Sequence, residues 1–127
     1  MKIGTDIIEI DRIAKAIKKP SFLKKCFTPS EASLIEERGP KAAAANFAAK
    51  EAIAKALGTG YRGFSPKDIE ILRDKKGKPY ANLYGKAKAI AHAAYLDNIE
   101  ITISHNKTCA VAFVLLFNTE NKIVYSR

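Results

Sequence analysis

The chain has 127 residues, of which 28% are charged, and its formal net charge at pH 7 is +9. This length predicts one domain, residues 1–127, that is large enough to bury a core. No apolar run approaches the roughly 18 residues that a membrane helix needs, and Asp6 comes too early for a secretory signal segment. We therefore expect a cytoplasmic protein that has no membrane partner.

The positive charge implies an anionic partner, which can be nucleic acid, a membrane surface, a phosphorylated small molecule or an acidic protein. Most of the 22 basic residues are lysine, whereas base recognition in DNA favours the bidentate fork of arginine. The composition thus disfavours sequence-specific DNA recognition without excluding non-specific binding. Cys26 and Cys109 are isolated in the sequence, so we expect neither a zinc site nor a disulfide framework.

The N-terminal segment 3–10 is rich in isoleucine and predicts a strand. Side chains alternate between two faces, one with Ile3 and Ile7 and the other with Asp6 and Ile8, so we expect both faces to be covered. A carboxylate beside isoleucines is costly unless a cation or hydrogen-bond donors compensate its charge. Asp6 is therefore either a functional carboxylate or a strand-end residue that bonds to backbone or caps the next helix.

A basic helix is predicted over residues 11–19, with Asp11 as its N-cap and Pro20 as its stop. Its polar side and the following turn carry the highest density of positive charge in the chain. We call these six residues the basic surface: Arg12, Lys15, Lys18, Lys19, Lys24 and Lys25. Such a run is usually a solvated face, but here it exceeds what solubility requires, and we expect it to dock a partner.

The next helix is predicted to begin with Thr28 as its N-cap and with Glu31 completing a capping box. It runs to about Arg38, where Gly39-Pro40 breaks it. A third helix then begins near Lys41.

The sequence NFAAKEAIAKALGTG, residues 46–60, is the central stretch of this third helix. Its alanines recur at helical spacing, so they form a stripe that a neighbouring element can approach closely. Glu51 precedes Lys55 by four residues on another side, which suits either a solvated ion pair or a functional pair. Gly58 suits the left-handed position that follows a helix C-terminus.

The C-terminal half predicts mainly strands. Segments 68–72 and 80–83 form a hairpin with Lys78 at its tip, and an alanine-rich helix follows over 85–95. Two apolar strands, 99–104 and 109–117, meet at a connection that holds His105, and residues 120–127 predict a short edge strand. The fold class is α+β, with a small antiparallel sheet packed on the alanine-rich central helix and additional helices. His105 is a candidate site residue because it lies on a connection between strands.

Four segments in this order resemble the holo-acyl-carrier-protein synthases, the small bacterial phosphopantetheinyl transferases. They are GTDIIEIDRI, FTPSE, NFAAKEAIAKALGTG and DIEI…GKP…ISH. The resemblance implies a 4′-phosphopantetheinyl transferase-like fold and a homotrimer with a site at each subunit interface. The implied activity is magnesium-dependent transfer of the phosphopantetheine arm from coenzyme A to a serine of apo-acyl carrier protein, in fatty acid biosynthesis.

The resemblance also implies residue roles. Asp6 and Glu51 match the family's magnesium ligands, Lys55 matches a lysine on the pyrophosphate, and His105 matches a histidine at the coenzyme A site. Magnesium would also explain why a carboxylate tolerates an apolar face. Glu51, directly or through a metal-bound water, is the candidate to accept the proton of the attacking serine.

Other implied coenzyme A contacts are Arg38, Lys41, Phe47, Gly58, Thr59, Gly60, Lys78 and Pro79. The basic surface would attract the acidic carrier protein. Asn46 stands where relatives often have arginine, which places one cofactor contact in doubt. Two alternatives remain open from the residues themselves: a basic nucleic-acid-binding module, and a magnesium-dependent hydrolase that uses the same Asp6–Glu51 pair.

Overall fold

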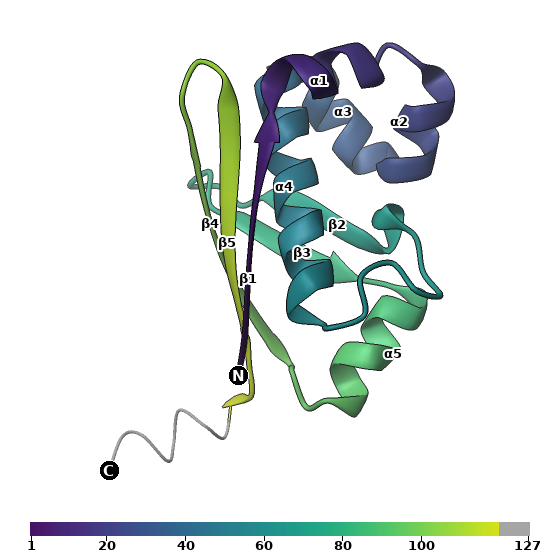
Figure 1. Ribbon diagram of the computed structural model, residues 1–127, viewed down its shortest axis with the longest axis vertical. Helices are drawn as coiled ribbons and strands as arrows, with labels where there is room; N and C mark the ends of the chain where they lie inside the picture. The colour runs from purple at the N-terminus through teal and green to yellow at the C-terminus, as the bar shows by residue number, and fades with distance from the viewer. Residues whose placement is uncertain (120–127) are drawn as a thin grey trace.

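A three-stranded antiparallel sheet forms one layer of the molecule, for which a computed structural model describes residues 1–119 (Figure 1). Its strand order is β1 (Lys2–Glu9), β5 (Cys109–Phe117) and β4 (Asn98–His105). The predicted apolar strands are confirmed, whereas the edge strand predicted at 120–127 lies outside the described residues. Within residues 1–119, no helix has the length and apolar character needed to cross a bilayer.

Helix α4 (Pro40–Ala56) lies between this sheet and a hairpin of β2 (Ile69–Arg73) and β3 (Pro79–Leu83) (Figure 1). Three shorter helices gather at one end: α1 (Ile10–Ala16), α2 (Pro20–Cys26) and α3 (Pro29–Arg38). Helix η1 (Pro66–Asp68) precedes the hairpin, and α5 (Gly85–Ala93) follows it. The α+β class and the central position of the alanine-rich helix are therefore confirmed.

The alanine stripe of α4 allows β1 to lie unusually close to the helix. Ala48, Ala49 and Ala52 are fully buried, and Gly4 of β1 packs directly against the α4 backbone. A Cβ atom added at Gly4 would lie 2.0 Å from the carbonyl oxygen of Ala52. This contact matters for the site because it places Asp6, two residues further along β1, beside α4.

Replacing Gly4 with alanine is expected to lower the free energy of unfolding by about 3 kcal/mol, because the added methyl group must push β1 away from α4. Denaturant unfolding measures the loss, and Gly77→Ala is the control. Gly77, unlike Gly4, has a left-handed φ of 85°, so alanine meets backbone strain there, but an added Cβ meets no atom within 4 Å. An equal or smaller loss for Gly4→Ala than for Gly77→Ala would contradict the close-packing argument.

One face of β1 is exposed, which corrects the prediction that both faces are covered. Gly4 and Ile8 face α4, but the side of the sheet away from α4 has no covering layer within the described chain. There Ile3, Ile7 and Phe113 are 63%, 65% and 46% exposed. We call this apolar patch the exposed sheet face and define it by Ile3, Ile7, Val111 and Phe113.

The first helix also differs from its prediction. It begins at Ile10 with Glu9 as its N-cap, so Asp11 lies in the first turn and does not cap the helix, and it ends at Ala16. Pro20 occupies the first turn of α2 and therefore starts a helix instead of only ending one. By contrast, the capping box of Thr28 and Glu31 at the start of α3 is confirmed.

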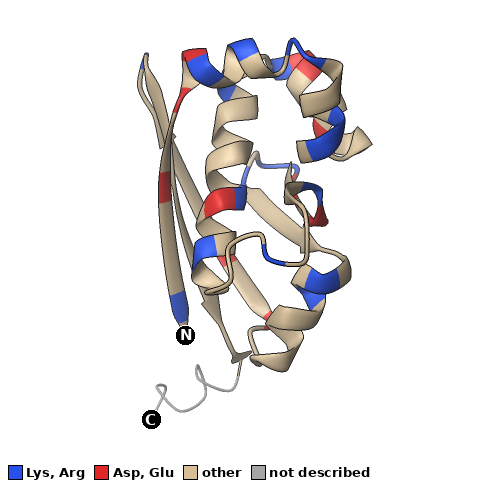
Figure 2. Cartoon of the chain, turned by 45° about the vertical axis from the view of Figure 1, so that its right-hand side comes forward, with Lys and Arg blue, Asp and Glu red and all other residues tan. Residues whose placement is uncertain are grey.

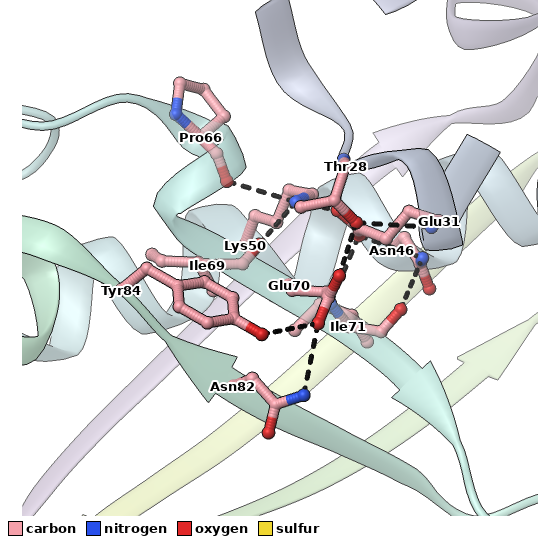
Figure 3. Close-up of polar contacts among 10 residues, drawn as sticks. All are labelled: Thr28, Glu31, Asn46, Lys50, Pro66, Ile69, Glu70, Ile71, Asn82 and Tyr84. Carbon is pink, nitrogen blue, oxygen red and sulfur yellow. Dashed lines mark hydrogen bonds and ion pairs between the residues drawn. The ribbon is translucent and has the colours of Figure 1, made fainter. Parts of the chain in front are cut away.

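Side chains of α3 and α4 take the place of a strand along the outer edge of β2 (Figure 3). Glu31 accepts a hydrogen bond from the N–H of Ile71 (3.1 Å), and Asn46 donates to the carbonyl of Ile71 (2.9 Å). Lys50 donates to the carbonyls of Ile69 and Pro66 and to Glu31. Within residues 1–119 no further strand lies beside β2, but the N–H of Ile71 and the carbonyls of Ile69 and Ile71 on this edge are paired.

Candidate active site

Asp6, Glu51 and Lys55 form a cluster where β1 meets α4. The Lys55 ammonium lies 2.8 Å from the Asp6 carboxylate and also donates to the carbonyl of Thr5. Lys55 is thus tied to β1, 49 residues away from it in sequence, instead of forming only a local helical pair with Glu51. The Asp6 side chain is 16% exposed, so Lys55 supplies the compensating cation that its apolar surroundings require.

The pKa of Glu51 is raised, first by burial and then by the negative charge of Asp6. Two carboxylates that repel each other across a half-buried site favour a cation between them. Among residues 1–119, no group of three or more His, Cys, Asp or Glu side chains could hold a metal. Magnesium nevertheless fits Asp6 and Glu51, because it commonly takes one or two protein carboxylates and completes its shell with water and substrate phosphates.

Phe47 lies on the same side of α4 as Glu51, one helical turn earlier, and its ring packs against Phe22 with centroids 5.9 Å apart. The loop that follows α4 has Gly58 and Gly60 in left-handed conformations (φ 82° and 58°). The left-handed position predicted for Gly58 is confirmed. The Thr59 hydroxyl donates to the carbonyl of Gly60, so this loop is a defined turn beside the cluster.

A second site lies on another side of α4. A pocket of about 310 Å³ is bounded by the end of α3, the start of α4, the hairpin turn and the end of β4. We call it the arginine pocket, and its lining residues are Arg38, Lys41, Ala42, Ala45, Arg73, Gly77, Pro79, Ile103 and His105. Four of the predicted coenzyme A contacts, Arg38, Lys41, Pro79 and His105, therefore meet in one place.

Arg73 was not predicted as a site residue, and the structure adds it to this pocket. Burial lowers the pKa of its guanidinium, and the nearby positive charge of Arg38 lowers it further. Because like charges held close together destabilise each other, a pocket with this arrangement favours an anion between them. The guanidinium fork of each arginine is suited to a phosphate group.

The predicted coenzyme A contact Lys78, and Asn46, where a contact was in doubt, both lie outside the arginine pocket. The Lys78 ammonium contacts Glu100 at 2.6 Å and lines a neighbouring groove on β4, outside the arginine pocket. Asn46 is fully buried and donates hydrogen bonds to Glu31 and Ile71. Asn46 therefore serves the interior of the protein, whereas Arg73 lines the pocket.

The cluster and the arginine pocket lie far apart within one chain. Lys41 and Glu51 are ten residues apart on α4, which is about 15 Å along the helix axis. The helix rotates by about 100° per residue, so Ala42 and Ala45 lie on a different side from Glu51 and Lys55. The cluster and the arginine pocket are thus two separate places along α4.

All six residues of the basic surface are exposed, on or next to α1 and α2. Figure 2 shows basic positions gathered on the helical end of the molecule. The cluster lies next to this surface, because α1 follows β1 directly and the charge of Arg12 acts on Glu51.

Two carboxylates beside a lysine, together with a separate arginine-rich pocket, suit an enzyme that transfers a phosphate-linked group. The family model for the 4′-phosphopantetheinyl transferase superfamily matches residues 2–115. A holo-[acyl-carrier-protein] synthase of Alkaliphilus oremlandii is 53% identical over 113 residues, which cover 87% of this chain and 93% of the relative.

Solved structures agree with these sequence matches. Helicobacter pylori holo-[acyl-carrier-protein] synthase, in complex with coenzyme A, has a TM-score of 0.80 and 34% identity over 91% of this chain and 99% of that one. The Bacillus anthracis holo-(acyl-carrier-protein) synthase, in complex with CoA (3′,5′-ADP), has a TM-score of 0.77 and 34% identity over 93% of this chain and 96% of that one. The chain belongs to the 4′-phosphopantetheinyl transferase superfamily and, within it, to the holo-[acyl-carrier-protein] synthases.

Proposed function

We propose that this enzyme transfers the 4′-phosphopantetheine arm of coenzyme A to a serine hydroxyl of an apo-acyl carrier protein, with magnesium. The observation that carries the proposal is the cluster in which β1 and α4 bring together Asp6, Glu51 and Lys55. The serine oxygen forms a bond to the phosphorus on the pantetheine side, and the bridging P–O bond of the pyrophosphate breaks. Adenosine 3′,5′-bisphosphate leaves, and the serine proton is transferred to a base.

Glu51 is the base in this proposal. Burial and the charge of Asp6 raise its pKa in the protein without a bound cation. With magnesium bound, it would accept the serine proton either directly or through a metal-bound water. Lys55 is more than half exposed and within reach of Asp6, so its ammonium can hold a pyrophosphate oxygen as negative charge develops on the leaving group. Magnesium, held by Asp6 and Glu51, would neutralise further charge on the pyrophosphate. Direct transfer requires positioning and charge neutralisation, which these three residues can supply.

The nucleotide end of coenzyme A is assigned to the arginine pocket. Arg38, Lys41, Arg73 and His105 offer donors for its phosphate groups, and Ala42, Ala45 and Ile103 offer an apolar wall. Phe47 and the turn Gly58–Thr59–Gly60 border the cluster, and the pantetheine arm, which is attached to the pyrophosphate, is assigned to this side. The complexes of the two relatives with coenzyme A or its nucleotide support this ligand.

Intact-mass spectrometry tests the activity directly. An apo-acyl carrier protein is incubated with the enzyme and coenzyme A, in magnesium or in EDTA. The carrier is expected to gain the mass of one phosphopantetheine arm in magnesium only. No gain with several carrier proteins would overturn the proposal, and salt-dependent nucleic-acid binding would then be measured. An equal gain in EDTA would remove magnesium from the mechanism.

The enzyme is further proposed to work as a homotrimer in which the cluster of one copy faces the arginine pocket of the next. The two parts lie on different sides of α4, with about 15 Å along the helix between Lys41 and Glu51, and the exposed sheet face is an apolar surface that a second copy can cover. Both features support a site shared between copies.

Replacing Ile7 and Phe113 together with lysine is expected to give a monomer with little activity, because charges would be buried at the interface. Light scattering coupled to size-exclusion chromatography measures the molar mass. Ser33→Lys, at an exposed position of α3, is the control and should keep both assembly and rate. A fully active monomer of the double variant would exclude the shared site.

The basic surface is proposed to dock the acidic carrier protein. Replacing Arg12, Lys15 and Lys18 with glutamate should raise the KM for carrier protein by about tenfold at low salt while the KM for coenzyme A stays unchanged. The control carries the same change in charge elsewhere, with Lys67, Lys86 and Lys88 replaced by glutamate near α5. Equal effects of the two triple variants would show that only net charge matters, and not this surface.

A further inference from the structure

Lys50 is a fully buried lysine next to Glu51 in sequence, yet it has no access to the cluster. Its side chain is 0% exposed, and its ammonium lies 2.6 Å from Glu31, whose side chain is also 0% exposed. The remaining donors of the ammonium reach the carbonyls of Pro66 and Ile69 (Figure 3). All three N–H groups of Lys50 are therefore used inside the protein, and the residue cannot bind substrate in this arrangement.

Glu31 and Asn46 complete the same unit. Glu31 accepts from Lys50, from Asn46 and from the backbone N–H of Ile71, so its charge is compensated although it is buried. Asn46 joins Glu31 to the carbonyl of Ile71. Helices α3 and α4 thus hold the outer edge of β2 through side chains that substitute for a neighbouring strand.

The inner side of the hairpin is anchored as well. Glu70, only 7% exposed, accepts hydrogen bonds from Thr28 at the start of α3, from Asn82 in β3 and from Tyr84 (Figure 3). The hairpin is therefore fixed to α3 and α4 by polar contacts at Ile69, Glu70 and Ile71. Its turn lies beyond this anchored part of β2.

The anchored strand leads directly to the arginine pocket. Arg73 follows Ile71 by two residues, about 7 Å along the strand, and it lines the pocket together with Gly77 and Pro79 of the same hairpin. The opposite wall, Lys41 with Ala42 and Ala45, belongs to α4, which also carries Asn46 and Lys50. The distance between the two walls is therefore set by the contacts of Glu31, Asn46 and Lys50 with β2.

We propose that Glu31, Asn46 and Lys50 are positioning residues that hold the hairpin against α4 and so fix the arginine pocket for the nucleotide end of coenzyme A. The proposal rests on the assignment of that pocket under the proposed function. It separates the two lysines of the KEAIAK segment by role: Lys55 acts at the cluster, whereas Lys50 acts on the pocket through β2.

The test is a double variant, Glu31→Gln with Lys50→Met, which removes both buried charges and nearly keeps the volumes. Glutamine can still accept from the N–H of Ile71, but methionine leaves the carbonyls of Pro66 and Ile69 without their donor. The KM for coenzyme A and the Kd for adenosine 3′,5′-bisphosphate are expected to rise about tenfold, with kcat within about twofold. A merely structural loss of folded enzyme would lower the rate at every concentration and leave the KM unchanged.

Hydrogen exchange provides a second readout that does not depend on activity. Amides of β2 and β3 should lose protection in the double variant, while amides of β1 and β5 keep theirs. Asn46→Leu removes the hydrogen bonds of Asn46 to Glu31 and to the Ile71 carbonyl without removing a charge. It should show the same loss of protection more weakly, and it serves as the test if the double variant does not fold.

Arg73→Ala separates this proposal from the pocket assignment, because it removes a pocket cation directly. If Arg73→Ala raises the KM for coenzyme A and the positioning variants leave it unchanged, the positioning role is overturned and the pocket stands. If Arg73→Ala also has no effect, the pocket assignment and the inference both fail. A rise in KM for both kinds of variant supports both.

Discussion

Glu51→Gln is expected to lower kcat about a thousandfold while the protein stays folded. Glutamine cannot accept the serine proton and is a poorer ligand for magnesium, and general-base catalysis alone is worth about two to four orders of magnitude. The folded state should be no less stable, because the change relieves repulsion with Asp6 and the cost of burying a charge. Initial rates by intact-mass spectrometry and thermal unfolding by circular dichroism measure the two effects.

The control for this variant is Glu36→Gln, which changes an exposed glutamate on α3 and should leave the rate unaltered. A wild-type rate in Glu51→Gln would remove Glu51 from the mechanism. A loss of rate that follows a loss of folded protein would likewise count against it as the base.

Lys50→Met is expected to lower the free energy of unfolding by about 3–5 kcal/mol. The Glu31 carboxylate would remain buried without a cation to compensate its charge, and an uncompensated buried charge is strongly destabilising. Denaturant unfolding measures the change. Adding Glu31→Gln should restore part of the loss, because the buried carboxylate is then removed, whereas the carbonyls of Pro66 and Ile69 still lack their donor.

Lys55→Met is the matched control, since it makes the same substitution five residues further along α4, in an ion pair whose lysine is 57% exposed. It should cost no more than about 1 kcal/mol of stability but abolish most of the activity. The two lysines thus give opposite results in the two assays. A loss of stability for Lys50→Met no larger than that for Lys55→Met would contradict the buried pair.

The elements were predictable because their signals are local. The alternation of isoleucines in β1, the capping box of Thr28 and Glu31, and the alanine spacing of α4 each depend on neighbouring residues, and the structure confirms all three. The predicted end of the first helix was wrong, because Pro20 can either stop a helix or begin one. Only the packing of α2 decides between these two roles.

The buried polar network was missed because its partners are distant in sequence. Lys50 is 19 residues from both Glu31 and Ile69, so the segment around it predicts an ordinary surface lysine. A signal was present: Asn46, Lys50 and Ile53 recur at i, i+4, i+7, which places a lysine on an otherwise buried stripe. Arg73 was missed for a similar reason, since its relation to Arg38 arises only when the hairpin packs beside α3.

The separation of the two half-sites along α4 has a thermodynamic consequence. If a complete site forms only between two copies, coenzyme A binds the assembled enzyme and not the single chain, so ligand binding and assembly are linked by mass action. Specific activity should then fall as the enzyme is diluted, and coenzyme A should shift the concentration at which the copies separate. If the site is shared in this way, the separation of about 15 Å along α4 makes the concentration of the enzyme a determinant of its activity.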